Sequence, residues 1–258
     1  MTAFQGLTAI VTGASRGFGL RTALRLYEAG ANLVLSDLMD DPGNIFSEFR
    51  QDRWTYLPGD ISDEDTSQDL VALALETFGR LDIAVNNAGI AQSNVALPFV
   101  SSEEARRIID VDLMGVFFAL KHQIPAMVKR HKKDGSTGCI VNIASVAGVS
   151  GAPTLSVYAA AKHGVVGLTR SAAAECARLG VRVNAVCPSF AKTDMVLGAI
   201  DAAPSGREAA VAELVRGVPM RRLAEIDEVV EAVIFAANPA NSFMTGQAIA
   251  IDGGITAL

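Results

Sequence analysis

The arrangement of apolar segments along the chain constrains its fold more than any other sequence feature. Short β-rich runs alternate with longer runs that have the apolar spacing of amphipathic helices. The predicted strands cover residues 7–12, 32–36, 54–57, 81–86, 139–144, 181–187 and 247–251, and the main predicted helices cover residues 19–29, 63–78, 102–130, 157–179 and 226–237. Most of these strands are almost continuously apolar, which is typical of strands covered on both faces. This alternation implies parallel pairing through right-handed crossovers.

The expected fold class is therefore α/β, a doubly wound sandwich of three layers with about seven parallel strands flanked by helices. A chain of 258 residues, 50% of them hydrophobic, supplies enough apolar material for one large core. No repeat, low-complexity tract or linker divides it, so one domain over residues 1–258 is predicted. The segment 191–219 is rich in glycine and proline, and we expect it to be the least regular part, a mobile lid over the substrate.

Charge and cysteine content argue against several classes of function. The formal net charge is −6 and long basic runs are absent, which disfavours nucleic acids and anionic membranes as partners. The three cysteines lack CxxC spacing, so neither a disulfide framework nor a metal site is expected, and a reducing cytoplasmic location is favoured. No apolar run is expected to reach the length of a membrane span, and the first apolar stretch is interpreted as a strand rather than a signal peptide.

A glycine-rich turn follows the first predicted strand. Residues 12–19 read Thr-Gly-Ala-Ser-Arg-Gly-Phe-Gly, and a predicted helix follows them. Small residues let the backbone approach a pyrophosphate, and a helix N-terminus offers free N–H groups and the positive end of the helix dipole. The spacing is G-x-x-x-G-x-G, which taken alone also fits a tight strand–helix turn that binds no ligand.

Asp37, at the end of the second predicted strand, favours NAD as the ligand of that turn. A carboxylate about twenty residues after the glycines can accept hydrogen bonds from both ribose hydroxyls of NAD. The same charge repels the 2′-phosphate of NADP, and the following Leu38 supplies no cation to offset it. Arg16 is the main argument for NADP, because a guanidinium could contact that phosphate. We weigh Asp37 above Arg16, so NAD is the expected cofactor and NADP the alternative.

A tyrosine and a lysine on one predicted helix indicate acid–base chemistry. Tyr158 and Lys162 are spaced i, i+4 and therefore share a helix face. A phenol titrates near ~10 and is too weak a base at neutral pH, whereas a nearby ammonium favours the phenolate. Such a pair also occurs by chance on helix surfaces. Ser145 strengthens the interpretation, because it follows a predicted strand at the end where such sheets bind ligands.

These motifs, in this order, closely resemble the short-chain dehydrogenase/reductase family over nearly the whole chain. The resemblance is carried by residues 12–19, Asp60-Ile61, Asn86-Asn87-Ala88-Gly89, Ser145, Tyr158-Ala-Ala-Ala-Lys162, Asn184-Ala-Val-Cys-Pro188 with Thr193, and Gly253-Gly254. It implies a Rossmann-type fold and an NAD(P)-dependent oxidoreductase that acts on CH–OH groups. It also implies a homotetramer assembled through the long helices and the C-terminal strand.

The resemblance implies a role for each motif residue. Ser145 hydrogen-bonds the substrate oxygen, Tyr158 is the general acid/base, and Lys162 favours the phenolate of Tyr158 and holds the nicotinamide ribose. The cofactor contacts that it implies are Gly13, Ser15, Arg16, Gly17, Phe18, Gly19, Asp37 and Leu38 at the turn and ribose, Asp60 and Ile61 at the adenine, Asn87, Ala88, Gly89 and Val111 along the centre, and Pro188, Ser189, Ala191 and Thr193 at the carboxamide, together with Tyr158 and Lys162.

Two positions depart from the family pattern. Asp112 stands where the family usually has an asparagine that holds a water in a proton relay to Lys162. We place Asp112 among the catalytic residues, because its backbone carbonyl could keep that role while its carboxylate favours a charged Lys162; a tolerated substitution is the alternative. Ser189 stands where a glycine usually follows Pro188, which affects the expected backbone path there.

The leading interpretation is an NAD-dependent enzyme that interconverts a small secondary alcohol, whether cyclic, aliphatic or a polyol, and its ketone. The expected substrate pocket is apolar and includes Val146, Ala147, Phe190 and Met195. An NADPH-dependent 3-oxoacyl-carrier-protein reductase is the nearest alternative, because that enzyme has the same triad. A non-catalytic nucleotide-binding protein of this fold is the alternative from another class; the intact triad argues against it, and only Asp112 favours it.

Overall fold

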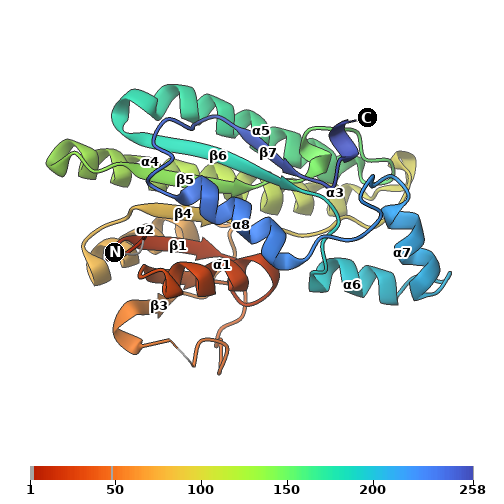
Figure 1. Cartoon of the computed structure of the whole chain (residues 1–258), viewed down its shortest axis with the longest axis horizontal. Helices are drawn as coiled ribbons and strands as arrows, with labels where there is room; N and C mark the ends of the chain where they lie inside the picture. Colours follow the sequence, from red (N-terminus) through yellow and green to blue (C-terminus); the bar gives the residue numbers. More distant parts are fainter. Residues whose placement is uncertain (1–2, 48, 258) are drawn as a thin grey trace.

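The computed structural model describes residues 3–47 and 49–257, and its centre is one seven-stranded parallel sheet (Figure 1). The strands are β1 (Thr8–Thr12), β2 (Asn32–Ser36), β3 (Trp54–Tyr56), β4 (Ile83–Asn86), β5 (Gly138–Ile143), β6 (Val181–Pro188) and β7 (Ala248–Ile251). Their order across the sheet is β3-β2-β1-β4-β5-β6-β7. The chain order reverses between β1 and β4, so the carboxyl ends of these two strands form the switch point at which such sheets bind nucleotides.

Helices cover both faces of this sheet and complete three layers (Figure 1). One face carries α1 (Gly17–Glu28) and α8 (Ile226–Ala237), and the other carries α2 (Glu64–Phe78), α4 (Gly115–Asp134) and α5 (Ser156–Cys176). Successive side chains of a strand point to opposite faces. Ile10 of β1 accordingly belongs to the cluster beneath α2, α4 and α5, and Val11 belongs to the cluster beneath α1 and α8. The predicted fold class is confirmed.

The long helix predicted over residues 102–130 is interrupted near its middle. α3 (Ser102–Ile109) leads into a π-helical segment, Asp110–Met114, which passes directly into α4. Apolar periodicity does not reveal such a single widened turn, and π-helical turns are common at functional sites. The segment contains Asp112, which is completely buried.

The same helical stretch corrects the expectation that no segment has the length and apolarity of a membrane span. Ser102–Asp134 meets that criterion by length and composition alone. Its α4 part packs against α2 and α5 in the helical layer of the sheet. Apolar helices inside a protein core have the same composition, so this helix is accounted for by its packing.

The segment 191–219 is more regular than predicted, because it contains α6 (Asp194–Asp201) and α7 (Arg207–Val215). The Thr193 hydroxyl accepts a hydrogen bond from the Val196 N–H and so caps α6. Ile200, Ala210 and Leu223 form a small apolar cluster of their own beneath these helices. Both helices are too short for periodicity to separate them from a loop. They lie beyond the carboxyl end of β6 (Figure 1).

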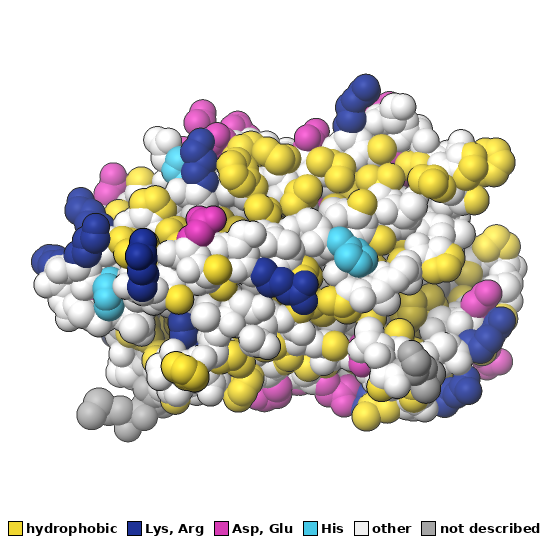
Figure 2. Space-filling view, turned by 90° about the horizontal axis from the view of Figure 1, so that it is seen from above, with side chains coloured by type: hydrophobic (Ala, Val, Ile, Leu, Met, Phe, Trp, Pro, Cys, Tyr) yellow, Lys and Arg dark blue, Asp and Glu magenta, His cyan; other side chains and the backbone are white. Residues whose placement is uncertain are grey.

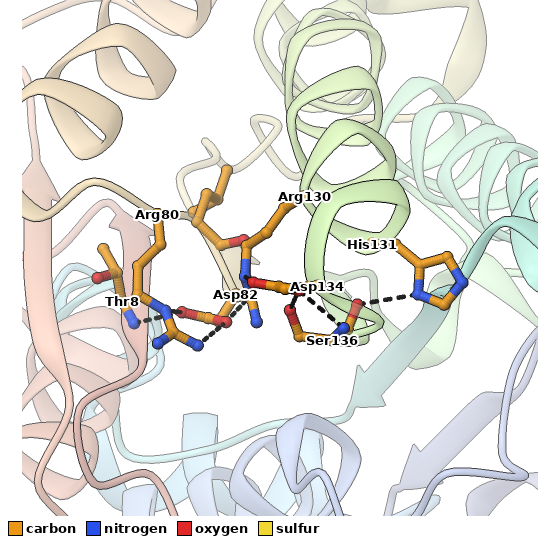
Figure 3. A network of polar contacts seen from close by, with 8 residues as sticks. Thr8, Arg80, Asp82, Arg130, His131, Asp134 and Ser136 are labelled. Atoms are coloured by element: carbon orange, nitrogen blue, oxygen red, sulfur yellow. Dashed lines mark hydrogen bonds and ion pairs between the residues drawn. The ribbon is translucent and has the colours of Figure 1, made fainter.

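A buried carboxylate joins three elements at the amino end of the sheet (Figure 3). Asp82 is 2% exposed and directly precedes β4. It accepts hydrogen bonds from the Thr8 backbone N–H (2.8 Å) and from the Arg80 guanidinium (2.7 and 2.9 Å). Arg130 of α4 donates to its Oδ1. Both oxygens are therefore satisfied, and two guanidinium groups balance the charge.

Candidate active site

The glycine-rich turn connects β1 to α1 at the switch point of the sheet, and close contacts require glycine at two of its positions. A Cβ atom on Gly19 would lie 1.9 Å from the Gly13 carbonyl oxygen, and one on Gly13 would lie 2.9 Å from the Ala88 backbone. The Asn87 side chain donates to the carbonyls of Thr12 (2.9 Å) and Gly13 (3.1 Å). The turn is thus held against the loop that follows β4.

The start of α1 fits the phosphates of a dinucleotide. Arg16 precedes the helix, and within the described residues its side chain makes no capping hydrogen bond, so the N-cap leaves the first-turn N–H groups to an anion. Gly17 has a φ of +54°, and a Cβ atom there would lie 3.7 Å from the Thr193 side chain. Two segments that the sequence assigns to one cofactor, the turn and the loop after β6, therefore lie side by side.

The Asp37 carboxylate is fixed next to this turn. Its Oδ2 accepts from the Ser15 backbone N–H (2.9 Å) and from the Ser15 hydroxyl, and its Oδ1 accepts from the Leu38 N–H (2.8 Å). A carboxylate has about four acceptor positions, so one remains for a ribose hydroxyl. The Asp37 carbonyl also accepts from the Gly59 N–H (3.0 Å), which brings the following Asp60 turn beside it.

Lys162 is the buried cation of the site, at 4% exposure. Its Nζ lies 3.4 Å from Asp112 Oδ2, donates to the Ile143 carbonyl at 3.3 Å, and lies 5.5 Å from the centre of the Tyr158 ring. Burial alone would lower the pKa of Lys162, but Asp112 and then Tyr158 outweigh it and raise that pKa above its ordinary value. Lys162 therefore carries its charge at neutral pH.

Asp112 contacts Lys162 directly through its carboxylate. Its Oδ1 accepts from the Ile90 N–H (2.8 Å), whereas its Oδ2 has no hydrogen-bond donor within the described residues and faces only the Lys162 ammonium. A Cβ atom on Gly89 would lie 3.2 Å from Asp112 Oδ1 and 3.3 Å from Lys162 Nζ. The loop after β4 can therefore pass this ion pair closely because it has a glycine there.

Ser145 is 9% exposed and begins the 3-10 turn Val146–Gly148 after β5. Its Oγ accepts from the Ala147 N–H (3.1 Å), which leaves its hydroxyl proton free to be donated. The turn packs on α5, since a Cβ atom on Gly148 would lie 2.7 Å from the Lys162 carbonyl oxygen. The structure thus brings the segments of Ser145 and Lys162 together.

The four predicted substrate residues come from two separate segments. Val146 is half-buried, and Ala147 is only 3% exposed. Phe190 packs against the cluster around Ile200, and Met195 on α6 is 49% exposed. Met195 therefore presents the most accessible apolar side chain of the four.

The remaining predicted cofactor residues lie along the same end of the sheet. Pro188 ends β6, the Ser189 N–H donates to the Ile251 carbonyl (3.1 Å), and Ala191 forms a bridge with Ala224.

The side chain of Ile61 packs on Gly115 at the start of α4. Phe18 is in the first turn of α1, and Val111 is in the π-helical segment.

Thr12, which begins the glycine-rich motif, and Gln92, which carries no sequence signal, hold the site through long-range hydrogen bonds. The Thr12 hydroxyl accepts from the backbone N–H groups of Asn87 and Ala88 (both 3.1 Å). Gln92 is buried and bonds the first turn of α5. Both partners are distant in sequence, so no local pattern could indicate these contacts.

Comparison with known proteins decides the family. A family model described as "Enoyl-(Acyl carrier protein) reductase" matches residues 13–256, nearly the whole chain. The chain belongs to the short-chain dehydrogenase/reductase family. As a member of that family it is an NAD(P)-dependent oxidoreductase that acts on CH–OH groups.

Three known proteins are similar to this short-chain dehydrogenase/reductase over nearly their whole length. It is 39% identical over 259 residues to a 2,5-dichloro-2,5-cyclohexadiene-1,4-diol dehydrogenase of Sphingobium indicum, with 100% of both chains covered. It is 40% identical over 258 residues to a cis-4-hydroxycyclohexanecarboxylate dehydrogenase of Sinomonas cyclohexanicum, with 99% of both covered. A 3-ketoacyl-(acyl-carrier-protein) reductase from Brucella melitensis, solved with NADH, superposes with a TM-score of 0.88 at 32% identity, covering 98% of this chain and 99% of that one.

Proposed function

We propose that this enzyme uses NAD to interconvert a small, uncharged cyclic secondary alcohol and its ketone, with Tyr158 as the general acid/base. The observation that carries the proposal is the buried Lys162 ammonium, paired with Asp112 and one helical turn from Tyr158. A desolvated cation beside a phenol stabilises the phenolate.

In the oxidative direction, the Tyr158 phenolate takes the proton of the substrate hydroxyl. Ser145 donates its free hydroxyl proton to the substrate oxygen and thereby fixes its position. Lys162 stabilises the phenolate before the transfer, and Asp112 keeps Lys162 charged. Bound NAD supplies the acceptor for the hydride that leaves the carbinol carbon. In the reverse direction, Tyr158 returns the proton to the oxygen of the ketone.

Asp37 supports NAD over NADP. Its carboxylate is already oriented by Ser15 and Leu38, so its remaining acceptor position can take one ribose hydroxyl without reorganisation, and its negative charge would repel a 2′-phosphate. Parallel titrations with NAD and NADP test this choice. Tighter binding of NADP would favour the NADPH-dependent 3-oxoacyl-carrier-protein reductase instead, whereas Asp37→Ala is expected to reduce the preference for NAD.

The charged side chains of the lid segment 191–219 and of the adjoining residues 222–228 support an uncharged substrate. Lys192 pairs with Glu225, Arg207 with Asp201 and Arg222 with Glu228. Hydrogen bonds from Arg222 and from the Glu225 backbone lower the pKa of Glu228 to about 2, so that pair stays ionic. These three cations are thus occupied and do not form a ready clamp for a substrate carboxylate.

The ring substrates of the two named relatives support a cyclic alcohol. A panel of cyclohexanol, a cyclohexanediol and 4-hydroxycyclohexanecarboxylate tests both parts of the substrate proposal. We expect kcat/KM to be highest for the uncharged rings. A clear preference for 4-hydroxycyclohexanecarboxylate would contradict the proposal that the substrate is uncharged. A preference for open-chain alcohols would contradict the proposal that it is cyclic.

Tyr158→Phe tests the mechanism. We expect kcat to fall by about 10²- to 10⁴-fold, the usual range for loss of a general acid/base, while NAD binding persists. Equal turnover by both forms would remove Tyr158 from the mechanism. Binding of NAD without turnover of any secondary alcohol by the parent enzyme would favour the non-catalytic alternative.

Assembly into a homotetramer is part of the proposal. β7 is an edge strand that pairs only with β6 in the described sheet, and Phe243, just before it, is 104% exposed. Figure 2 shows hydrophobic side chains across the face seen from above, the side on which Figure 1 places α5 and β7. An open sheet edge with an exposed aromatic residue is usually covered by a partner. Light scattering of the parent and of Phe243→Asp tests this.

A cytoplasmic location is also proposed. All three cysteines are free and buried, and burial raises the pKa of Cys139 and of Cys187 to about 11. Such thiols are stable in a reducing compartment and form no cross-links. Fractionation of cells that express the protein is the direct test.

A further inference from the structure

A buried glutamine from another part of the chain occupies the N-terminal end of the helix that carries Tyr158. Gln92 lies in the loop after β4 and is 6% exposed. Its Oε1 accepts from the backbone N–H groups of Val157 (2.9 Å) and Tyr158 (3.0 Å). Its Nε2 donates to the Thr154 carbonyl (3.1 Å). The amide thus satisfies two donors and one acceptor at the start of α5.

α5 has no cap of its own. The N-cap residue is Leu155, whose side chain has no polar atom, and no side-chain hydrogen bond caps the helix from that position. The Ala159 N–H bonds the Leu155 carbonyl, and the two preceding N–H groups are those that Gln92 accepts. Free N–H groups of a helix start require partners when water is excluded. A side chain 65 residues away supplies them.

The segment just before α5 is held in a strained conformation by the same loop. Thr154 has a φ of +67°, in the left-handed region that a β-branched residue rarely adopts. Its carbonyl accepts from Gln92 and from the Val95 N–H (3.3 Å), and its hydroxyl bonds Asn94. Residues 92–95 thus hold Thr154 in place, and strain of this kind persists only where the surroundings enforce it.

Tyr158 and Lys162 are held in different ways. Asp112 and the Ile143 carbonyl fix the Lys162 ammonium from two other elements. Tyr158 is in the first turn of α5, the part of a helix that frays most readily, and Gln92 holds its backbone there. The distance between the phenol and the ammonium therefore depends on this contact.

We propose that Gln92 is a positioning residue, which caps α5 from the loop after β4 and thereby fixes the Tyr158 phenol relative to Lys162 and Ser145. The inference rests on the proposed role of Tyr158 as the acid/base. Gln92 also follows the Asn87-Ala88-Gly89 segment by only three residues. One loop therefore connects the glycine-rich turn to the acid/base tyrosine.

Two substitutions of Gln92 separate capping from packing. Gln92→Met keeps length and volume but removes the acceptor, and misplacement of a reacting group by ~1 Å can cost ~10²-fold, so we expect kcat to fall by about 10- to 100-fold. The dissociation constant of NAD should change little, because Gln92 does not contact the glycine-rich turn. Gln92→Glu keeps an acceptor that the helix dipole favours but loses the donor to the Thr154 carbonyl, so its kcat should lie between those of Gln92→Met and the parent.

The matched control is Gln123→Met. Gln123 of α4 is the other buried glutamine, at 3% exposure, and it bonds Asn86 at the end of β4. The Gln123→Met substitution should lower the melting temperature while leaving the kcat of the folded enzyme close to that of the parent. Unchanged kcat in Gln92→Met, or a loss of kcat shared equally by Gln123→Met, would overturn the inference. If Gln92→Met does not fold, Gln92→Asn takes its place, since the shorter amide cannot reach both N–H groups, and an unchanged kcat there has the same meaning.

Tyr158→Phe is measured in the same series. Full turnover by Tyr158→Phe would reject the proposed function and leave Gln92 without a catalytic partner. An inactive Tyr158→Phe beside a fully active Gln92→Met would reject only the positioning role. The two failures are therefore distinguishable.

Discussion

Asp82 and Asp112 are both buried carboxylates paired with cations, and they lie at opposite ends of the same sheet. Asp82, at 2% exposure, accepts from a backbone N–H and from two guanidinium groups, so both of its oxygens are satisfied. Asp112, at 0% exposure, accepts one backbone N–H, and its second oxygen faces Lys162 alone among the described residues.

The difference separates a structural ion pair from a functional one. A fully hydrogen-bonded carboxylate between two arginines fixes the ends of β1, β4 and α4 and leaves no group to react. Burying the incompletely hydrogen-bonded Asp112 carboxylate costs desolvation free energy, and its charge keeps the neighbouring Lys162 ammonium protonated. Perturbed groups of this kind concentrate at active sites.

The largest effect is expected for Lys162→Met. Without the ammonium the phenolate loses its stabilisation, so kcat should fall by about 10²- to 10⁴-fold. The variant also leaves the buried Asp112 unpaired, which lowers the melting temperature. The double variant Lys162→Met/Asp112→Leu should recover the melting temperature but not kcat, and recovery of kcat would show that Lys162 acts only through stability.

Asp82→Asn should affect stability and not turnover. Breaking a buried ion pair costs about 3 kcal/mol, which corresponds to a fall of roughly 6–12 °C in melting temperature for a domain of this size. Thermal denaturation measures the loss, and kcat at 25 °C should match that of the parent. A parallel fall in kcat of the folded protein would remove the distinction between the two ends of the sheet.

Asp112→Asn should move the alkaline limb of activity. Because the folded-state pKa of Lys162 is raised, its ammonium contributes stability that is present below about 10.4 and is lost as pH rises through the higher folded pKa. Removing the carboxylate lowers that pKa, so the alkaline limb of the kcat profile moves to lower pH. Near neutrality kcat should change by less than about tenfold, since the family pattern carries asparagine here. An unmoved profile would mean that the carboxylate has no electrostatic role.

The smallest effect is expected for Asp134→Ala. Asp134 is an exposed i, i+4 partner of Arg130 at 3.7 Å, and Arg130 keeps its buried bond to Asp82 without it. Solvent screens such a pair, and the hydrogen bonds that Asp134 also accepts from the Ser136 N–H and hydroxyl are exposed, so the melting temperature should fall only slightly and kcat should not change. A clear loss of stability would show that the Asp82 cluster extends to its exposed rim.

The five central strands could be predicted closely because they are buried on both faces. The predicted strand 139–144 is observed as Gly138–Ile143, and the predicted strand 32–36 is observed as Asn32–Ser36. The helix over 226–237 also matches α8, Ile226–Ala237. Agreement was poorer where local patterns are weak. α6 and α7 are short, and the π-helical turn around Asp112 changes the register of a helix without changing its composition.

The candidate site likewise contains residues that could be predicted from the sequence and one that could not. The i, i+4 spacing placed Tyr158 and Lys162 on one face of a helix, and the structure has them on one face. Gln92 could not be found in this way, because its partners are 65 and 66 residues away and no motif relates them.

The sequence by itself determined the alternation of strands and helices, the order of the motifs and hence the family and its chemistry on CH–OH groups, because periodicity and short motifs are local properties of the chain. Only the tertiary structure decided that the Asp112 carboxylate meets Lys162 and that Gln92 caps the helix of Tyr158. These contacts join residues that the crossovers of the sheet bring together, and their distances depend on how whole elements pack.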